Sequence, residues 1–154
     1  MTTPNYSFYA IPALWLLAGS THWYAVGLSK ASKDLPEFDN VAPRDFYETV
    51  RKMDRKIPAV GRFLRAEAAT ANTLEALPMF TAAIIAGACA RLPAEYMNQF
   101  VAGYLASRVL FSLLYVNTTR RKYSFLRTIV FCGGVASIVR TLLKAGAAFN
   151  NRVV

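Results

Sequence analysis

The stretch "RAEAATANTLEALPMF", residues 65–80, decides the fold class because it begins like a soluble helix and continues into a strongly apolar run. Residues 76–90 contain no charged side chain, and Asn72 and Glu75 lie at the transition. A helix that crosses a bilayer needs about 20 predominantly apolar residues, and the run that starts at Ala68 is long enough. The stretch therefore predicts a membrane-spanning helix that brings an amide and a carboxylate to the edge of the lipid phase, or into it.

Three further apolar runs lie on either side of this one. Of the 154 residues, 55% are hydrophobic and only 18% are charged, and the charges are clustered. The four runs fall at about residues 8–28, 68–90, 96–116 and 125–149. They are too long for strands and have no hairpin signals, and their short second and third connections favour antiparallel neighbours. We therefore predict an all-α membrane protein with a single domain over residues 1–154, folded as a four-transmembrane-helix antiparallel bundle.

The basic residues responsible for the net charge of +9 are concentrated in two loops. The loop 29–64, which has room for one helix at about Pro43 to Lys56, holds eight of them, and residues 120–122 hold three more. Basic loops remain on the cytosolic side of a membrane, so both termini are expected on the opposite, non-cytosolic side. Attraction to anionic lipid heads explains the surplus. Membrane lipids are therefore expected partners, and nucleic acid is not.

The two cysteines, Cys89 and Cys132, fall inside predicted spans and have no CxxC or Cys/His context. A zinc site is therefore not supported, and no metal site is predicted. We expect both to be buried structural thiols. His22 has no obvious partner in the sequence, and we expect it to be packed or interfacial rather than catalytic.

Polar residues inside the predicted spans form two stripes. Helical spacing places Arg65, Ala68, Asn72, Glu75 and Met79 on one face of the second span, and Tyr104, Arg108, Phe111 and Tyr115 on one face of the third. Charges at membrane depth cost about 2.5–3.5 kcal/mol each and usually pair or face a cavity. Glu75 and Arg108 are natural partners. Either their pair only locks two helices together, or it belongs to a polar pocket for an anionic molecule and a hydrophobic co-substrate.

At this point the sequence resembles the MAPEG superfamily, the membrane-associated proteins in eicosanoid and glutathione metabolism. The second-helix signature Asn-x-x-Glu-x-x-Pro-x-Phe is matched by Asn72, Glu75, Pro78 and Phe80. "DNVAPR" resembles the Asn-x-x-Pro-Arg of the cytosolic loop, "RVLFSLLY" the third-helix motif, and "FLRT" the start of the fourth helix. These motifs occur in the family's order through most of the chain.

The resemblance implies a homotrimer of four-helix subunits in the endoplasmic reticulum or microsomal membrane, with glutathione held between neighbouring subunits. It places Arg127 as the catalytic residue that stabilises the glutathione thiolate, since a nearby guanidinium lowers the pKa of a thiol. Asn72 and Glu75 would hold the peptide backbone and the free amine. Arg44, Arg65 and Arg108 are candidates for its carboxylates or for bracing Glu75, and Tyr115 belongs to the same cofactor-binding set. The implied function is a glutathione-dependent transferase, peroxidase or isomerase that acts on lipophilic electrophiles.

Two departures from the family pattern keep other functions open. Ala68 stands where many members have a second Arg, and Phe111 stands where the third-helix motif has a Tyr. These residues favour a non-catalytic lipid-binding or scaffold trimer as one alternative. A second alternative is a glutathione-independent isomerase or cyclase of a hydrophobic metabolite.

Overall fold

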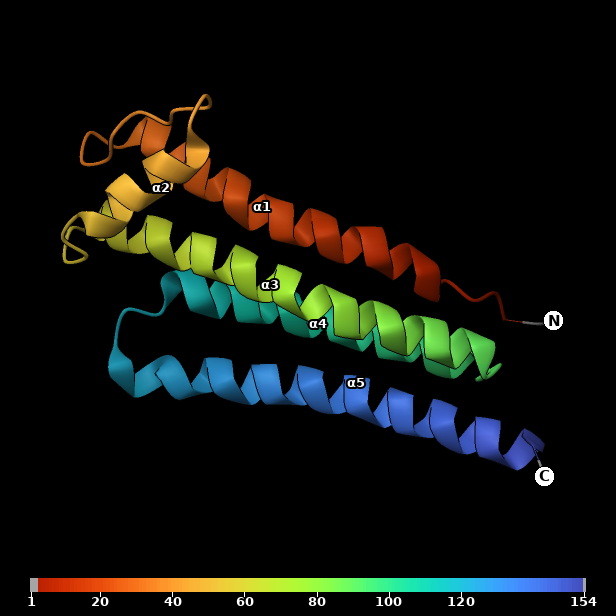
Figure 1. Ribbon diagram of the computed structural model, residues 1–154. Coiled ribbons are helices and arrows are strands. Elements are labelled where there is room, and N and C mark those ends of the chain that lie inside the picture. Colours follow the sequence, from red (N-terminus) through yellow and green to blue (C-terminus); the bar gives the residue numbers. More distant parts are fainter. Residues whose placement is uncertain (1–2, 154) are drawn as a thin grey trace.

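The computed structural model describes residues 3–153, with side chains to residue 151, and this part of the chain is helical without strands. Four long helices lie side by side, a short helix crosses one end of the bundle, and both termini lie at the other end (Figure 1). The elements are η1 (Ser7–Tyr9), α1 (Ala10–Ala31), α2 (Pro43–Lys52), α3 (Pro58–Cys89), α4 (Ala94–Asn117), η2 (Arg121–Tyr123) and α5 (Ser124–Val153). The all-helical prediction is confirmed.

Three of the described helices, α3, α4 and α5, are long and apolar enough to cross a membrane. Helix α1 has 22 residues, which is sufficient length, yet it is not among these three. Its middle contains the polar run Gly19, Ser20, Thr21 and His22, and this run lowers the mean hydropathy. The prediction of membrane helices is therefore supported for three of the four expected spans.

Helix α3 is the central element of the bundle, because it contacts all four other α-helices, α1, α2, α4 and α5. It begins at Pro58, a residue that favours the first helical position because its missing N–H would have no partner there. The predicted span begins only at Ala68, so the observed helix continues beyond the apolar run by more than two turns. Its first turns, Val60 and Phe63 in particular, are buried under α2 and its flanking loop.

Two apolar clusters hold the bundle together. The first lies between α1, α3, α4 and α5, where the rings of Phe80 and Tyr104 stack with centroids 4.3 Å apart. The second fixes α2 on α3, where Phe46 meets Phe63 edge to face at 5.6 Å. Aromatic pairs of this geometry stabilise a fold by about 0.5–1.5 kcal/mol beyond their buried area. The second cluster therefore holds the basic loop against the end of the bundle.

The cysteine prediction was wrong, because Cys89 and Cys132 are both free and exposed. Each faces away from the helix neighbours of its own chain. An apolar helix in lipid can place a small hydrophobic side chain on its outer face without cost, so a position inside a span does not by itself imply burial.

Candidate functional site

A basic cavity opens where α2, α3, α4 and α5 meet, at the end of the bundle opposite the termini. It has a volume of about 490 Å³. Its lining residues are Tyr47, Arg51, Arg55, Gly61, Leu64, Arg65, Ala68, Tyr115 and Arg127. This lining contains four arginines and no carboxylate, so the cavity is suited to an anionic ligand that guanidinium groups can bind in bidentate fashion.

Three of the sequence-predicted residues meet in this cavity. The Arg127 guanidinium carbon lies 4.3 Å from the centroid of the Tyr115 ring, a cation–π contact that fixes Arg127 over α4. Arg65 donates from Nε to the carbonyl oxygen of Val116 at 2.9 Å, which leaves its terminal nitrogens available. Arg51 and Arg55 were not predicted as site residues. Their membership in the basic loop was the available signal, but only the docking of α2 brings them to α3.

A smaller cavity of about 220 Å³ lies deeper along the same three long helices. It is lined by Asn72, Glu75, Ala76 and Met79 of α3, Tyr104 and Arg108 of α4, and Phe131, Val135, Ile138 and Val139 of α5. Arg108 is only 2% exposed. Its Nη2 donates to the Asn72 backbone carbonyl at 2.8 Å and to the Asn72 side-chain oxygen at 2.9 Å. A buried cation is thus held in a space whose other lining residues are apolar except for Asn72, Glu75 and Tyr104.

The expected ion pair between Glu75 and Arg108 is not formed among the described residues, where Arg108 pairs with Asn72 instead. Positions 72 and 75 differ by about 60° around a helix with 3.6 residues per turn. Asn72 therefore points at α4, whereas the Glu75 side chain is exposed at the rim of the cavity. The Arg108 Nε and the Ser112 hydroxyl are buried and have no partner in the described part of the chain.

The two cavities lie one after the other between α3 and α5, beside α4, and the two together are called the α3–α5 groove below. On α3 the lining passes from Ala68 to Asn72, about one helical turn further along. On α5 it passes from Arg127 to Phe131, again about one turn. From Gly61 to Met79 the groove follows α3 for about 27 Å at 1.5 Å per residue. Its cationic mouth and its apolar interior suit a polar anionic group and a hydrophobic group at the same time.

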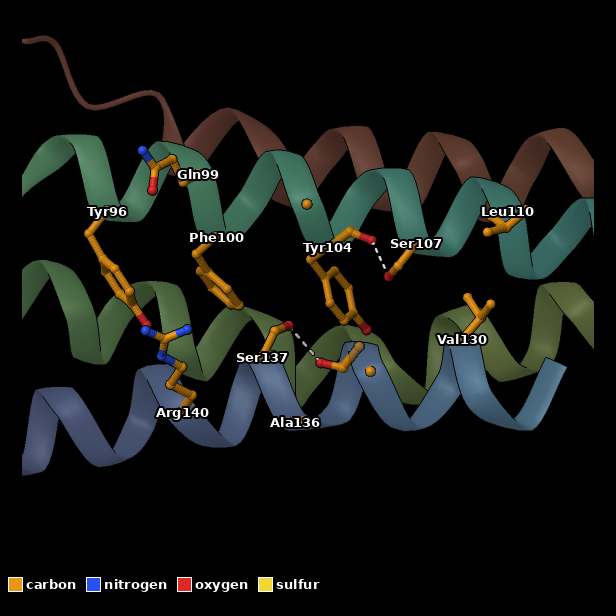
Figure 2. A pocket seen from close by; sticks show the side chains of 13 residues that line it. Tyr96, Gln99, Phe100, Tyr104, Ser107, Leu110, Val130, Ala136, Ser137 and Arg140 are labelled. Carbon is orange, nitrogen blue, oxygen red and sulfur yellow. Dashed lines mark hydrogen bonds between the residues drawn. The ribbon is translucent and has the colours of Figure 1, made fainter. Parts of the chain in front are cut away.

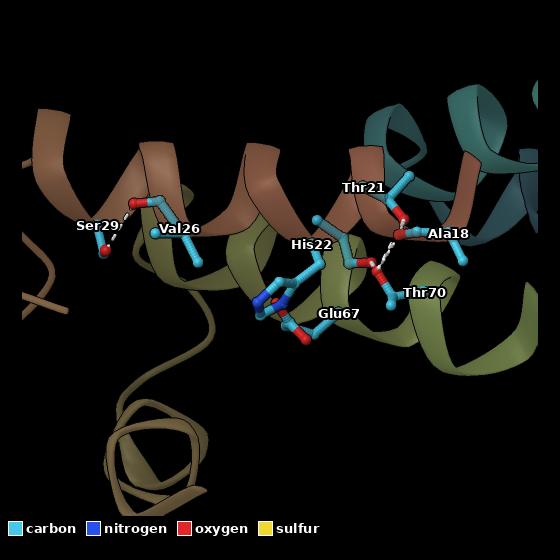
Figure 3. A network of polar contacts seen from close by, with 8 residues as sticks. Ala18, Thr21, His22, Val26, Ser29, Glu67 and Thr70 are labelled. Atoms are coloured by element: carbon cyan, nitrogen blue, oxygen red, sulfur yellow. Dashed lines mark hydrogen bonds and ion pairs between the residues drawn. The ribbon is translucent and has the colours of Figure 1, made fainter. Parts of the chain in front are cut away.

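Arg44, which was predicted for the same site, lies elsewhere. It lines a third cavity of about 490 Å³ together with Phe38, Phe46, Tyr47, Phe63 and other residues of α1, α2 and α3. This cavity includes His22, whose Nδ1 lies 2.7 Å from the Glu67 carboxylate oxygen (Figure 3). The hydroxyl of the adjacent Thr21 lies 2.7 Å from that of Thr70, which is about one turn along α3 from Glu67. His22 therefore has a partner in α3 that sequence reasoning missed, although Glu67 lies in the opening stretch.

Comparison with known proteins gives one positive result. A family model described as "MAPEG family" matches residues 8–147, nearly the whole chain. Comparison with curated proteins and with solved structures gives no match. The matched region contains every lining residue of the basic cavity and of the deeper cavity.

Proposed function

The chain belongs to the MAPEG family. On this basis we propose that it is an integral membrane enzyme that uses glutathione to act on lipophilic electrophiles, as a transferase, peroxidase or isomerase. The observation that best supports this function is the groove between α3 and α5. It combines a cavity lined by four arginines with a deeper, mostly apolar cavity that begins beside Arg108 and extends to Met79 and Val139. Glutathione has two carboxylates for the arginines and a thiol that must ionise before it reacts.

In this proposal Arg65, Arg51 and Arg55 bind the glutathione carboxylates at the cationic mouth. Arg127, held against the Tyr115 ring, stabilises the thiolate. A nearby cation lowers the pKa of a thiol and so increases the nucleophilic fraction at neutral pH. The apolar walls formed by Met79, Phe131 and Val135 receive the lipophilic electrophile from the membrane.

Asn72 and Glu75 connect the two parts of the proposed site. Asn72 holds Arg108 in place, and Glu75 stands exposed at the rim, where a carboxylate suits the free amine of glutathione. An exposed carboxylate beside lipid would be costly, so a neighbouring subunit is expected to cover this face. We therefore propose a homotrimer with the groove at a subunit boundary, in the endoplasmic reticulum or microsomal membrane, with both termini on the non-cytosolic side. Arg44 lines neither cavity of the groove in its own subunit, so its proposed role in binding glutathione depends on the trimer.

The test is a titration of the purified protein with glutathione, followed by the ultraviolet absorbance of the thiolate near neutral pH. The unmodified protein is expected to bind glutathione and show the thiolate signal. Arg127→Ala should lower the thiolate fraction at least about tenfold, because a neighbouring opposite charge lowers a pKa by about one to three. Arg120→Ala is the matched control, since Arg120 is exposed in the α4–α5 connection and does not line the basic cavity.

Absence of binding at millimolar glutathione would end this proposal. A lipid or metabolite that then copurifies with the protein, without thiol dependence, would instead support the lipid-binding trimer or the glutathione-independent enzyme. Conversion of that molecule by the protein would separate these two alternatives. The two residues that differ from the family pattern both lie near the site. Ala68 lines the basic cavity with a small side chain. The centroid of the Phe111 ring lies 4.7 Å from the Arg108 guanidinium carbon.

A further inference from the structure

A second groove runs along the outer surface between α4 and α5, on a different face of α5 from the proposed glutathione site. It has a volume of about 660 Å³. Figure 2 shows its lining, from Tyr96, Gln99 and Arg140 at one end to Leu110 and Val130 at the other. Its floor is formed by small residues, because Gly103, Gly133 and Gly134 all line it. A Cβ added at Gly103 or Gly133 would meet nothing within 4 Å, so this floor is open space.

Two cations stand at one end of this groove, where the nearby Glu95 carboxylate accepts a hydrogen bond from Gln99 Nε2 at 3.4 Å. Arg140 lines the groove, and Lys144 lies one turn further along α5, with its ammonium nitrogen 4.2 Å from the centroid of the Tyr96 ring. The Tyr96 hydroxyl is in turn 3.0 Å from the Thr141 hydroxyl, which fixes the ring between the two cations. Among the side chains of residues 3–151, neither Arg140 nor Lys144 forms an ion pair.

The depth of this end identifies where the two charges lie in a bilayer. Tyr96 is in the first turn of α4, which begins at Ala94, so its level is close to the end of that helix. Tyrosine is enriched at membrane interfaces, and long basic side chains extend toward the same level. From Tyr96 to Leu110 the groove follows α4 for about 21 Å at 1.5 Å per residue, which exceeds half of a hydrocarbon core about 30 Å thick.

We propose that this groove binds an anionic phospholipid from the leaflet on the side of the membrane where the termini lie. Its phosphate would lie on Arg140 and Lys144, and one acyl chain would lie along the glycine floor. The charges supply the reason for an anionic headgroup, since two cations that form no ion pair in the described part of the chain attract phosphate electrostatically. The groove length and its mainly apolar walls supply the reason for an acyl chain. This site does not depend on glutathione binding, and its failure would leave the proposed function intact.

The proposal can be tested by native mass spectrometry of the purified protein after exchange into vesicles of phosphatidylglycerol or phosphatidylcholine. The unmodified protein is expected to retain phosphatidylglycerol in preference to phosphatidylcholine. The double variant Arg140→Gln/Lys144→Gln should lose about thirtyfold in phosphatidylglycerol retention, because each of the two basic residues contributes a similar share of the attraction to the anionic headgroup. The same variant should lose little in phosphatidylcholine retention. Gly133→Leu fills the open floor and should weaken retention of both lipids.

Two control variants separate a specific site from general charge and from misfolding. Arg120→Gln/Lys122→Gln removes two cations at the other end of the α4–α5 pair and should lower phosphatidylglycerol retention far less than Arg140→Gln/Lys144→Gln. Arg140→Lys keeps the charge, and a folded Arg140→Lys protein should retain most of the binding.

Equal retention of the two lipids by the unmodified protein would overturn the proposal. So would an unchanged result for Arg140→Gln/Lys144→Gln. If millimolar inorganic phosphate displaces the bound phosphatidylglycerol completely, the groove is a site for a free anion instead. If Gly133→Leu changes the oligomeric state while lipid retention stays the same, a second copy of the chain covers this face and the lipid proposal is wrong.

Discussion

The contact between Asn72 and Arg108 gives a prediction whose magnitude follows from its geometry. Arg108 is 2% exposed, and its Nη2 donates to two oxygens of Asn72, one from the backbone and one from the side chain. Asn72→Leu removes only the side-chain acceptor. A hydrogen bond to a charged group contributes about 1.5–3 kcal/mol, so we expect Asn72→Leu to lower the free energy of unfolding by about 2 kcal/mol, or about thirtyfold in the unfolding equilibrium.

A double-mutant cycle distinguishes this account from simple loss of packing. Arg108→Met removes the buried charge itself, and replacing a buried ionic group by an apolar one of similar size is often nearly neutral. In the background of Arg108→Met, Asn72→Leu should therefore cost little, and the cycle should give a coupling of about 2 kcal/mol.

Unfolding in mixed detergent micelles, followed by circular dichroism, provides the free energies for this cycle. Asn117→Leu is the matched control, because Asn117 is exposed near the end of α4 and exposed substitutions usually change stability by less than about 0.5 kcal/mol. A coupling near zero, or an Arg108→Met variant less stable than Asn72→Leu, would refute the reasoning.

Two further predictions concern α3 and α1. Glu75→Gln should weaken glutathione binding or subunit assembly about tenfold, because the amide has no charge with which to pair with an amine or a guanidinium. Met79→Leu on the same face is the control and should lower stability by less than about 1.5 kcal/mol. The thiolate titration measures binding and sedimentation measures assembly, and equal effects of the two variants would contradict the assigned role. Gly61→Ala should lower the free energy of unfolding by about 1–3 kcal/mol, since the added Cβ would lie 2.8 Å from the backbone oxygen of Arg55. A Cβ added at Gly27 would meet nothing within 4 Å, so Gly27→Ala should raise the free energy of unfolding by up to about 1 kcal/mol. Thermal unfolding measures this pair, and a shift in the same direction for both would show that the contact at Gly61 does not control stability.

The helices themselves could be predicted because uncharged runs of membrane length leave few other structures. The start of α3 at Pro58 could not, since its first turns are held by contacts with Phe46 and Val50 of α2 rather than by their own apolar pattern. Those contacts join residues separated in sequence, and nothing in the loop composition specifies which side of α3 the loop covers. The same docking brings Arg51 and Arg55 into the basic cavity.

The candidate site shows a similar division between local and tertiary information. Helical spacing correctly put Arg65, Asn72 and Glu75 on neighbouring parts of α3, but it did not fix the rotation of α3 against α4. That rotation is set by packing, in which Phe80 stacks on Tyr104. It directs Asn72 rather than Glu75 at Arg108. Opposite charge was the strongest pairing signal available in the sequence, and the amide nonetheless became the partner.

The polar contacts between α1 and α3 also affect how the chain is made. Helix α1 precedes α3 in the chain and emerges from the ribosome first, so at that moment Thr21 and His22 lack Thr70 and Glu67 as partners. Without them α1 enters the translocon with these polar side chains unpaired, and polar residues in a span lower the efficiency of its insertion. Stable integration of α1 is therefore expected to depend on the arrival of α3, whose Thr70 and Glu67 supply the missing partners.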